Sequence, residues 1–140
     1  MIILACDHGG FELKEYLKQY FSKHNIDFID KGALEYNKND DYPDIIKPAV
    51  KEVLKNSSNT GIFICGSGVG VSMVANRYKG IRCILAHNTQ IVELARKHNN
   101  ANVLALGGKY TSKQMALKII KTFLETRFEK GRHLRRIDKF

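Results

Sequence analysis

The sequence predicts an α/β protein in which helices cover both faces of a five-stranded parallel sheet. Five short apolar segments recur along the 140 residues, and segments with apolar residues at helical spacing separate them. The central apolar segment, residues 62–64, leads directly into a glycine-rich loop, as buried strands of α/β proteins commonly do before the next helix. The chain has no internal repeat, low-complexity segment or linker, so we expect residues 1–140 to form a single domain.

Each predicted strand is a short, mainly apolar run bounded by glycine or polar residues. Residues 62–64 combine β-branched and aromatic side chains, which suit a strand buried on both faces. Because strands and helices alternate along the chain, the strands are expected to run parallel in one sheet. The predicted strands cover residues 2–6, 26–29, 62–64, 82–86 and 103–106.

Apolar side chains at helical spacing predict amphipathic helices between the strands and after the last one. Pro43 suits the first turn of the second helix, whereas Pro48 is less suited to a helix interior and indicates a bend. Residues from about 125 to 140 form a basic C-terminal tail that is compatible with a further helix. The predicted helices cover residues 11–21, 42–54, a segment that follows Gly70, 89–98 and 112–124.

The composition indicates a globular protein with an anionic partner. Lysine and arginine number 23 against 14 aspartates and glutamates, a formal net charge of +9, which favours a phosphorylated small molecule or a nucleic acid. Three cysteines without a Cys-x-x-Cys pair argue against a disulfide framework and against a structural zinc site. The chain shows no leader-like start and no apolar run of about 20 residues, so we expect a cytoplasmic protein without a membrane partner.

The loop after residues 62–64 has the composition of an anion-binding site. Gly66, Gly68 and Gly70 allow the backbone to turn tightly and to direct several N–H groups toward one point, where the next helix begins. Cys65 stands beside this point, and the positive field there favours a thiolate that could act as a base or nucleophile. The same residues also fit an ordinary turn with a small buried cysteine. The spacing matches neither a dinucleotide fingerprint nor a P-loop.

Ligands of open parallel sheets bind at the carboxyl ends of the strands, so reactive side chains at those ends are site candidates. For Asp7, a structural alternative is to cap the first helix, and the neighbouring His8 is then incidental. The candidate positions at the strand ends are Asp7-His8, the loop from Cys65 to Gly70, His87-Asn88 and Gly107-Gly108.

Two further groups lie outside these strand ends. His98 and Asn99 close a predicted helix, where a histidine is an ordinary C-terminal residue, and strand order places His87 better than His98 for a site. Arg132 and Arg136 lie four residues apart and would share a helical face, so together they could grip a phosphate. A solvated basic tail explains the same spacing.

Taken together, these motifs resemble the type B ribose-5-phosphate isomerases, in a wider family that also includes the galactose-6-phosphate isomerase subunits. Several separate motifs match in the right order, from the first strand to the basic tail, so the resemblance covers essentially the whole chain. The matching motifs are Asp7-His8-Gly9-Gly10, Asp41-Tyr42-Pro43-Asp44, Cys65-Gly66-Ser67-Gly68-Val69-Gly70, His98-Asn99 and Gly131-Arg132-His133-Leu134-Arg135-Arg136.

The resemblance implies an aldose–ketose isomerase that interconverts ribose 5-phosphate and ribulose 5-phosphate, a reaction of the pentose phosphate pathway, without a metal or organic cofactor. It implies a three-layer, Rossmann-like α/β/α fold with a five-stranded parallel sheet. It also implies a homodimer or a dimer of dimers, with active sites shared between two subunits, and no nucleic-acid partner.

Four matched positions are implied to be catalytic. Cys65 looks like the base that moves a proton between the first two sugar carbons through an enediolate. His98 looks like the group that helps to open the furanose ring, and Ser67 and Asp7 are implied to lie near these proton transfers.

Other matched positions are implied to bind the substrate. The glycine-rich loop resembles the hole that holds the enediolate oxygen, two positions match sugar contacts, and three match the phosphate grip. These groups are Gly66, Gly68, Val69 and Gly70 for the oxygen, Tyr42 and Asn99 for the sugar, and His8, Arg132 and Arg136 for the phosphate.

Two positions depart from the pattern of some relatives. Some family members use a glutamate as the base and carry a serine where the cysteine stands. Here position 65 is cysteine and the loop position beyond Gly70 is Val71, which groups the chain with the thiol users. After Gly107-Gly108, where relatives often have arginine, this chain has Lys109, which attracts phosphate without the bidentate geometry of arginine.

Two alternatives stay open beside this interpretation. One is an isomerase of another phospho-sugar, such as galactose 6-phosphate or allose 6-phosphate, and the galactose enzymes are expected to need two unlike subunits. The other is a non-catalytic protein that binds phosphate or nucleic acid, which the net charge suggests. That reading leaves Cys65 without a role, and the sequence contains no recognised nucleic-acid reader motif.

Overall fold

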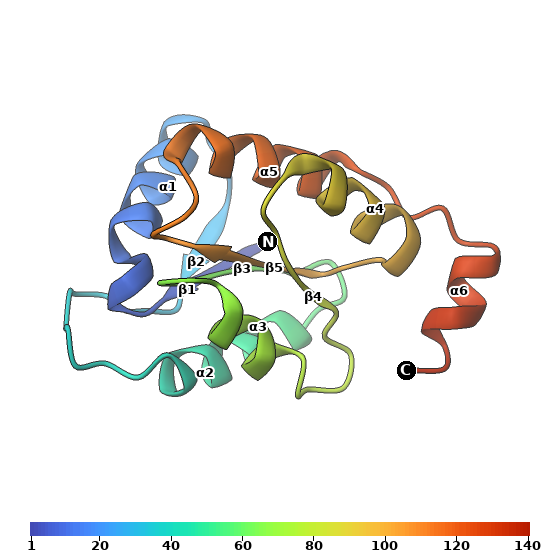
Figure 1. Cartoon of the computed structure of the whole chain (residues 1–140), viewed down its shortest axis with the longest axis horizontal. Helices are drawn as coiled ribbons and strands as arrows, with labels where there is room; N and C mark the ends of the chain where they lie inside the picture. Colours follow the sequence, from blue (N-terminus) through green and yellow to red (C-terminus); the bar gives the residue numbers. More distant parts are fainter.

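One five-stranded parallel sheet organises the chain, as the sequence predicts (Figure 1). The computed structural model describes all residues from 1 to 140. Every pair of neighbouring strands runs parallel, in the order β2-β1-β3-β5-β4. The strands are β1 (Ile2–Cys6), β2 (Phe28–Asp30), β3 (Thr60–Cys65), β4 (Cys83–Leu85) and β5 (Val103–Gly107).

The three central strands are buried on both faces because alternate side chains point to opposite sides of the sheet. In β3, Ile62 and Ile64 join one hydrophobic core, while Phe63 and Cys65 join the other. This explains why the central segment has a continuous apolar run rather than an alternating pattern.

Helices cover each of the two cores, which gives the three-layer arrangement seen in Figure 1. On one face lie α1 (Phe11–Lys23), α4 (Thr89–Asn99) and α5 (Lys113–Glu125). On the other lie α2 (Tyr42–Leu54) and α3 (Val69–Ala75). The helix α2 continues through Pro48 to its end, and a short 3-10 turn (His8–Gly10) precedes α1. No helix is both long and apolar enough to span a bilayer.

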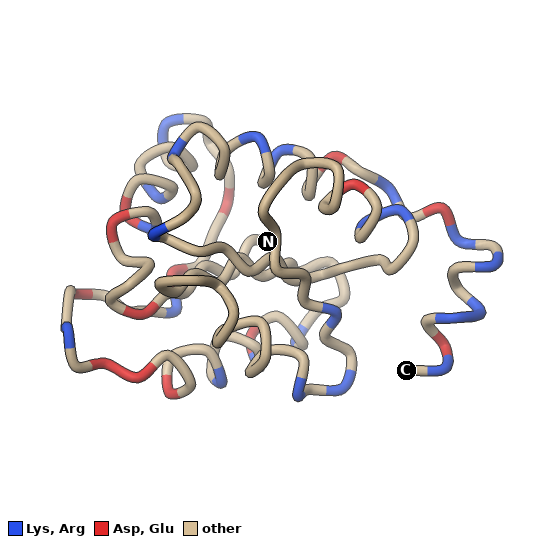
Figure 2. The backbone as a smooth tube through the Cα atoms, viewed as in Figure 1, with Lys and Arg blue, Asp and Glu red and all other residues tan.

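The basic tail does contain a helix, α6 (Arg132–Ile137). Figure 1 shows α6 at one end of the molecule, beyond the end of α4 and apart from the sheet. Figure 2 shows that lysine and arginine recur along this tail as well as over the outer helices. The Glu129 N–H donates to the Lys97 carbonyl at 3.0 Å, which ties the tail to the last turn of α4.

Parallel strands place all their carboxyl ends at one edge, and the helices return the chain to the other edge. The Gly61 N–H at the start of β3 donates to the Asn102 carbonyl, which follows the end of α4. Cys65 closes the same strand four residues later, roughly 13 Å further along at about 3.3 Å per residue. The end of α4 and the loop after β3 therefore lie at opposite edges of the sheet.

A fully buried lysine fastens the segment that follows β2. The Lys14 ammonium donates to both carboxylate oxygens of Asp30, at 2.9 and 2.7 Å, and to the Ala33 carbonyl at 2.6 Å. Burial alone would raise the pKa of Asp30, but hydrogen bonds from Lys14 and Lys18 outweigh it and hold that pKa below its ordinary value. This ion pair anchors the start of the loop of residues 31–41 at the carboxyl edge.

Replacing Asp30 with asparagine should destabilise the fold by about 3–5 kcal/mol, because it leaves the Lys14 charge buried without its partner. The contribution of Asp30 should be present above the ordinary carboxyl pKa of about 3.9 and should be lost as pH falls through the lower folded value. Urea unfolding of Asp30→Asn at neutral and acidic pH measures both effects. Lys18→Met, which removes a partly exposed partner, is the control, and an equal loss in both variants would contradict the role given to Lys14.

A candidate active site at the carboxyl edge of the sheet

A cleft of about 560 Å³ opens at the carboxyl ends of β1, β3 and β5. Four separate segments contribute to its lining, and most of the predicted residues of the strand ends meet there. Met73 and Tyr110 also line it, and nothing in the sequence pattern marked them. The predicted residues in the lining are Asp7, His8, Tyr42, Cys65, Gly66, Ser67, Val69, Gly70 and Lys109.

The glycine loop directs a backbone N–H toward the Cys65 thiol. The Gly68 N–H donates to the Cys65 Sγ at 3.1 Å, and Cys65 is only 5% exposed. Gly68 adopts φ +79°, and a Cβ at this position would lie 2.6 Å from the Leu85 side chain. Only glycine fits this turn, which directs the Gly68 N–H at the sulfur, where it stabilises negative charge.

The other two cysteines are unsuited to base chemistry. Burial raises the pKa of Cys6 to about 12, and burial raises the pKa of Cys83 to about 12 as well. Both thiols are therefore protonated at neutral pH, and neither lines the cleft. Cys65 is the one thiol that meets the loop.

Tyr42 and Lys109 border the loop on two sides. A Cβ added at Gly70 would come within 2.6 Å of the Tyr42 ring, so the phenol at the start of α2 lies directly against the loop backbone. The Lys109 N–H donates to the Gly66 carbonyl at 3.1 Å, which holds the lysine beside the same loop.

Asp7 both caps the turn before α1 and lines the cleft. Its Oδ1 accepts from the Gly9 N–H at 2.8 Å, which caps the short turn before α1. The residue is only 6% exposed, and this burial raises the pKa of the Asp7 carboxyl above its ordinary value.

His8 is held by Asp40, a partner that the sequence did not indicate. The His8 Nδ1 lies 2.6 Å from the Asp40 Oδ1, which also accepts from the His8 backbone N–H at 3.0 Å. This side-chain hydrogen bond raises the pKa of His8 above its ordinary value of 6.5. Asp40 belongs to the long polar loop of residues 31–41, whose path no periodicity reveals. The contact leaves the imidazole Nε2 as the nitrogen available to a ligand.

Several predicted residues lie elsewhere. His98 and Asn99 end α4, and Arg132 and Arg136 belong to α6, so the chain's own fold places them at the edge opposite Cys65. Strand order favoured His87, but this side chain is exposed and does not line the cleft.

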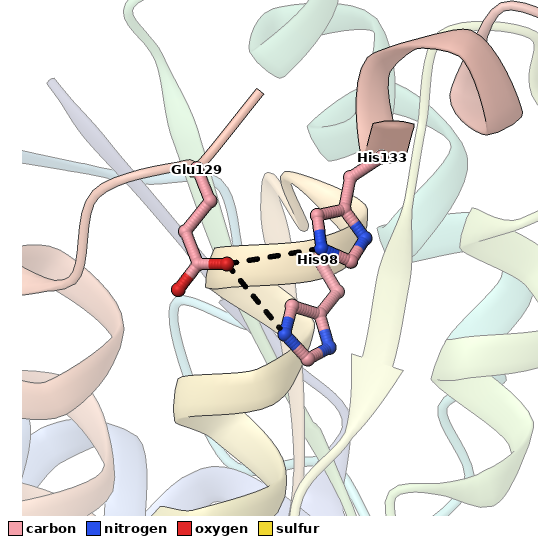
Figure 3. A group of neighbouring side chains, drawn as sticks. All are labelled: His98, Glu129 and His133. Atoms are coloured by element: carbon pink, nitrogen blue, oxygen red, sulfur yellow. Dashed lines mark ion pairs between the residues drawn. The ribbon is translucent and has the colours of Figure 1, made fainter. Parts of the chain in front are cut away.

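His98 has two neighbours that the sequence reading did not single out. Its ring stacks on that of His133, with centroids 4.2 Å apart, and Glu129 faces both rings (Figure 3). Burial, followed by the proximity of His98, lowers the pKa of His133 below its ordinary value.

The fold and cleft define an α/β/α protein with a thiol, an N–H loop and cationic side chains at one sheet edge, a site suited to a small anionic ligand. Comparison with known families is more specific. The Ribose/Galactose Isomerase family matches residues 2–140. The chain belongs to this family, which confirms the resemblance found in the sequence.

Close relatives match along nearly their whole length. A probable ribose-5-phosphate isomerase B from Mycoplasma genitalium is 42% identical, over 99% of this chain and 91% of the relative. A solved ribose 5-phosphate isomerase from Thermotoga maritima is 45% identical with a TM-score of 0.94, over 99% of this chain and 94% of that one. Ribose-5-phosphate isomerase B from Mycoplasma genitalium, solved with bound ribulose 5-phosphate, is 42% identical with a TM-score of 0.93. The match covers 99% of this chain and 91% of that one.

Replacing Asp40 with asparagine should lower the pKa of His8 toward 6.5, because the acceptor that stabilises the imidazolium loses its charge. In the native protein His8 should stay protonated to a higher pH than an ordinary histidine. Titration of the histidine ring signals by NMR measures the shift, with His24 as the internal reference. An unchanged His8 titration in Asp40→Asn would contradict the contact.

Proposed function

We propose that the chain interconverts ribose 5-phosphate and ribulose 5-phosphate. The observation that carries this proposal is the Cys65 thiol, which lies against the Gly68 N–H of the loop while His8 and Lys109 border the same cleft. A base, a cradle for an oxyanion and phosphate-binding cations are the groups that a phospho-sugar isomerase requires. Family membership and the relative solved with ribulose 5-phosphate support this choice of substrate.

The Cys65 thiolate acts as the base in this scheme. It removes the proton from C2 of the open-chain aldose, the C2–H electron pair forms the C1=C2 bond, and the carbonyl oxygen becomes an enediolate oxygen. The N–H groups of the loop, Gly66 to Gly70, hold that oxygen. A proton shift from O2 to O1 and return of the proton to C1 complete the ketose, so no oxidant or reductant is consumed.

The phosphate is held away from the reacting carbons and orients them. His8 is suited to this role because the hydrogen bond to Asp40 raises its pKa and so favours the cationic ring. Lys109 adds a second charge at the same cleft, while Tyr42 contacts the sugar and Ser67 and Asp7 assist its proton transfers.

The remaining groups come from a second subunit. His98 opens the furanose ring, Asn99 contacts the sugar, and Arg132 and Arg136 complete the phosphate grip. These residues lie at the edge of the sheet opposite Cys65, so one chain cannot bring them to its own cleft. A homodimer that sets the α4–α6 end of one subunit against the cleft of the other supplies them.

A groove at that end supports the dimer. It has a volume of about 1090 Å³, and its lining joins the β4 region to the tail helix α6. Apolar side chains form much of this lining, Leu85, Ile137 and Phe140 among them, and Phe140 is 75% exposed. An apolar surface of this kind is typical of a subunit interface.

The purified chain should convert ribose 5-phosphate to ribulose 5-phosphate with EDTA present, and Cys65→Ala should lower kcat/KM by about 10²–10⁴. Galactose 6-phosphate and allose 6-phosphate are the competing substrates to assay beside it. Turnover that survives in Cys65→Ala would remove Cys65 from the base role. A preference for a hexose phosphate would replace ribose 5-phosphate as the assigned substrate. No turnover of any sugar phosphate would overturn the proposed function.

Mixing two inactive variants tests the shared site. A heterodimer of Cys65→Ala and His98→Asn subunits keeps one site with both native groups, so unfolding and refolding an equal mixture should restore about a quarter of native activity. Cys65→Ala mixed with Ser67→Ala is the matched control, because both changes fall in the same half of the site and no native site forms. Equal activity in the two mixtures would show that His98 acts on the cleft of its own chain or not at all.

A further inference from the structure

Three side chains from separate segments converge beside the end of α4. His98 closes this helix, Glu129 lies in the connection to the tail, and His133 belongs to α6 (Figure 3). The Glu129 Oε2 lies 3.8 Å from the His98 Nε2 and 3.7 Å from the His133 Nε2. All three ligand atoms lie within 4.8 Å of one another. One oxygen thus faces two ring nitrogens at distances too long for hydrogen bonds.

We propose that His98, Glu129 and His133 form a binding site for a divalent ion of the zinc class. Two histidine nitrogens and a carboxylate oxygen are a familiar zinc ligand set, with a fourth position left to water. Ligands about 2.1 Å from a tetrahedral ion stand about 3.4 Å apart. The two observed nitrogen–oxygen separations exceed this value by less than half an ångström. An ion binds in the plane of each imidazole, so the two rings must also turn out of their parallel stack to complete the site.

The backbone already holds the three ligands in place. The Glu129 N–H donates to the Lys97 carbonyl at 3.0 Å, which fixes the carboxylate next to His98. The His133 side chain is only 9% exposed, so its packing keeps it beside the end of α4. The lack of paired cysteines argues only against a thiolate zinc site, and this ligand set contains no sulfur.

The other cluster of acidic and histidine side chains does not have this geometry. In the group of Asp7, His8 and Asp40, the His8 Nδ1 and the Asp40 Oδ1 are already joined by a hydrogen bond of 2.6 Å. An ion bound there would have to break this hydrogen bond and move the two atoms apart. At the proposed site, the Glu129 oxygen forms no hydrogen bond with either imidazole nitrogen, which distinguishes it from the group around His8.

Ion binding would inhibit the isomerase, an effect that rests on the proposed function. The ion takes the lone pair of the His98 Nε2, which is then no longer available for ring opening. It also binds α6 to the end of α4, and α6 carries the two arginines assigned to the phosphate. Those arginines oppose a cation near His133, so the Glu129 carboxylate is the ligand whose charge matters most.

Isothermal titration calorimetry with Zn²⁺ tests the site directly on chelator-treated protein. Cys65→Ala serves as the parent, because it removes the thiol of the cleft. We expect one Zn²⁺ per chain, and at least about 100-fold weaker binding when Glu129→Gln or His133→Asn is added, since loss of an outer-shell partner alone can cost 10–100-fold. His24→Asn, a change at the end of α1, is the matched control and should bind as the parent does.

Equal binding by the parent and both ligand variants, or no binding by the parent, would overturn the site. Co²⁺ gives a second readout, since a visible spectrum typical of a nitrogen and oxygen set should be lost in Glu129→Gln.

For inhibition, Glu129→Gln should turn over ribose 5-phosphate in EDTA as the native chain does and should need at least tenfold more Zn²⁺ for half-inhibition. Ion binding without turnover in EDTA would refute the proposed function while leaving the site intact.

Discussion

The close approach of three strand ends is the constraint on which the rest of the structure depends. At the carboxyl edge, the Gly108 N–H donates to the Cys65 carbonyl at 2.8 Å, which brings the loop after β5 onto the loop after β3. From the other side, a Cβ at Gly9 would lie 2.6 Å from the Gly66 nitrogen. Glycine is required where these backbones touch. The contact gathers a thiol, a carboxylate and an imidazole from distant parts of the sequence into one cleft.

The same parallel sheet explains why the site residues implied by the resemblance separate into two groups. Strands end at one edge, and each helix must carry the chain back before the next strand begins. Residues that end strands therefore meet in the cleft, whereas His98, which ends a helix, lies at the other edge. Strand order favoured His87 for this geometric reason, yet the His87 side chain is exposed and does not line the cleft. His98 would share a site with Cys65 only in the proposed dimer, because a site built from two subunits does not follow the edge rule of one sheet.

Periodicity and local backbone chemistry account for what could be predicted from the sequence. The five strands, their parallel order and the loop around Gly68 were recognisable because burial on two faces requires apolar runs and a left-handed turn favours glycine. Asp40 could not be found, since its contact with His8 depends on the path of a long loop without periodic side chains. Glu129 was missed for a similar reason, because only the fold of the tail carries it to the end of α4.

Phosphate charge gives a physical reason for the second subunit. A phosphate monoester carries about two negative charges near neutral pH, and the cleft of one chain offers His8 and Lys109 against it. Neither of these residues provides two parallel hydrogen bonds to one phosphate, as an arginine does. Arg132 and Arg136 have this geometry but stand on α6, at the far end of their own chain. In the proposed dimer, a partner would bring its arginines to the same phosphate as Lys109, which links the choice of residue at position 109 to assembly.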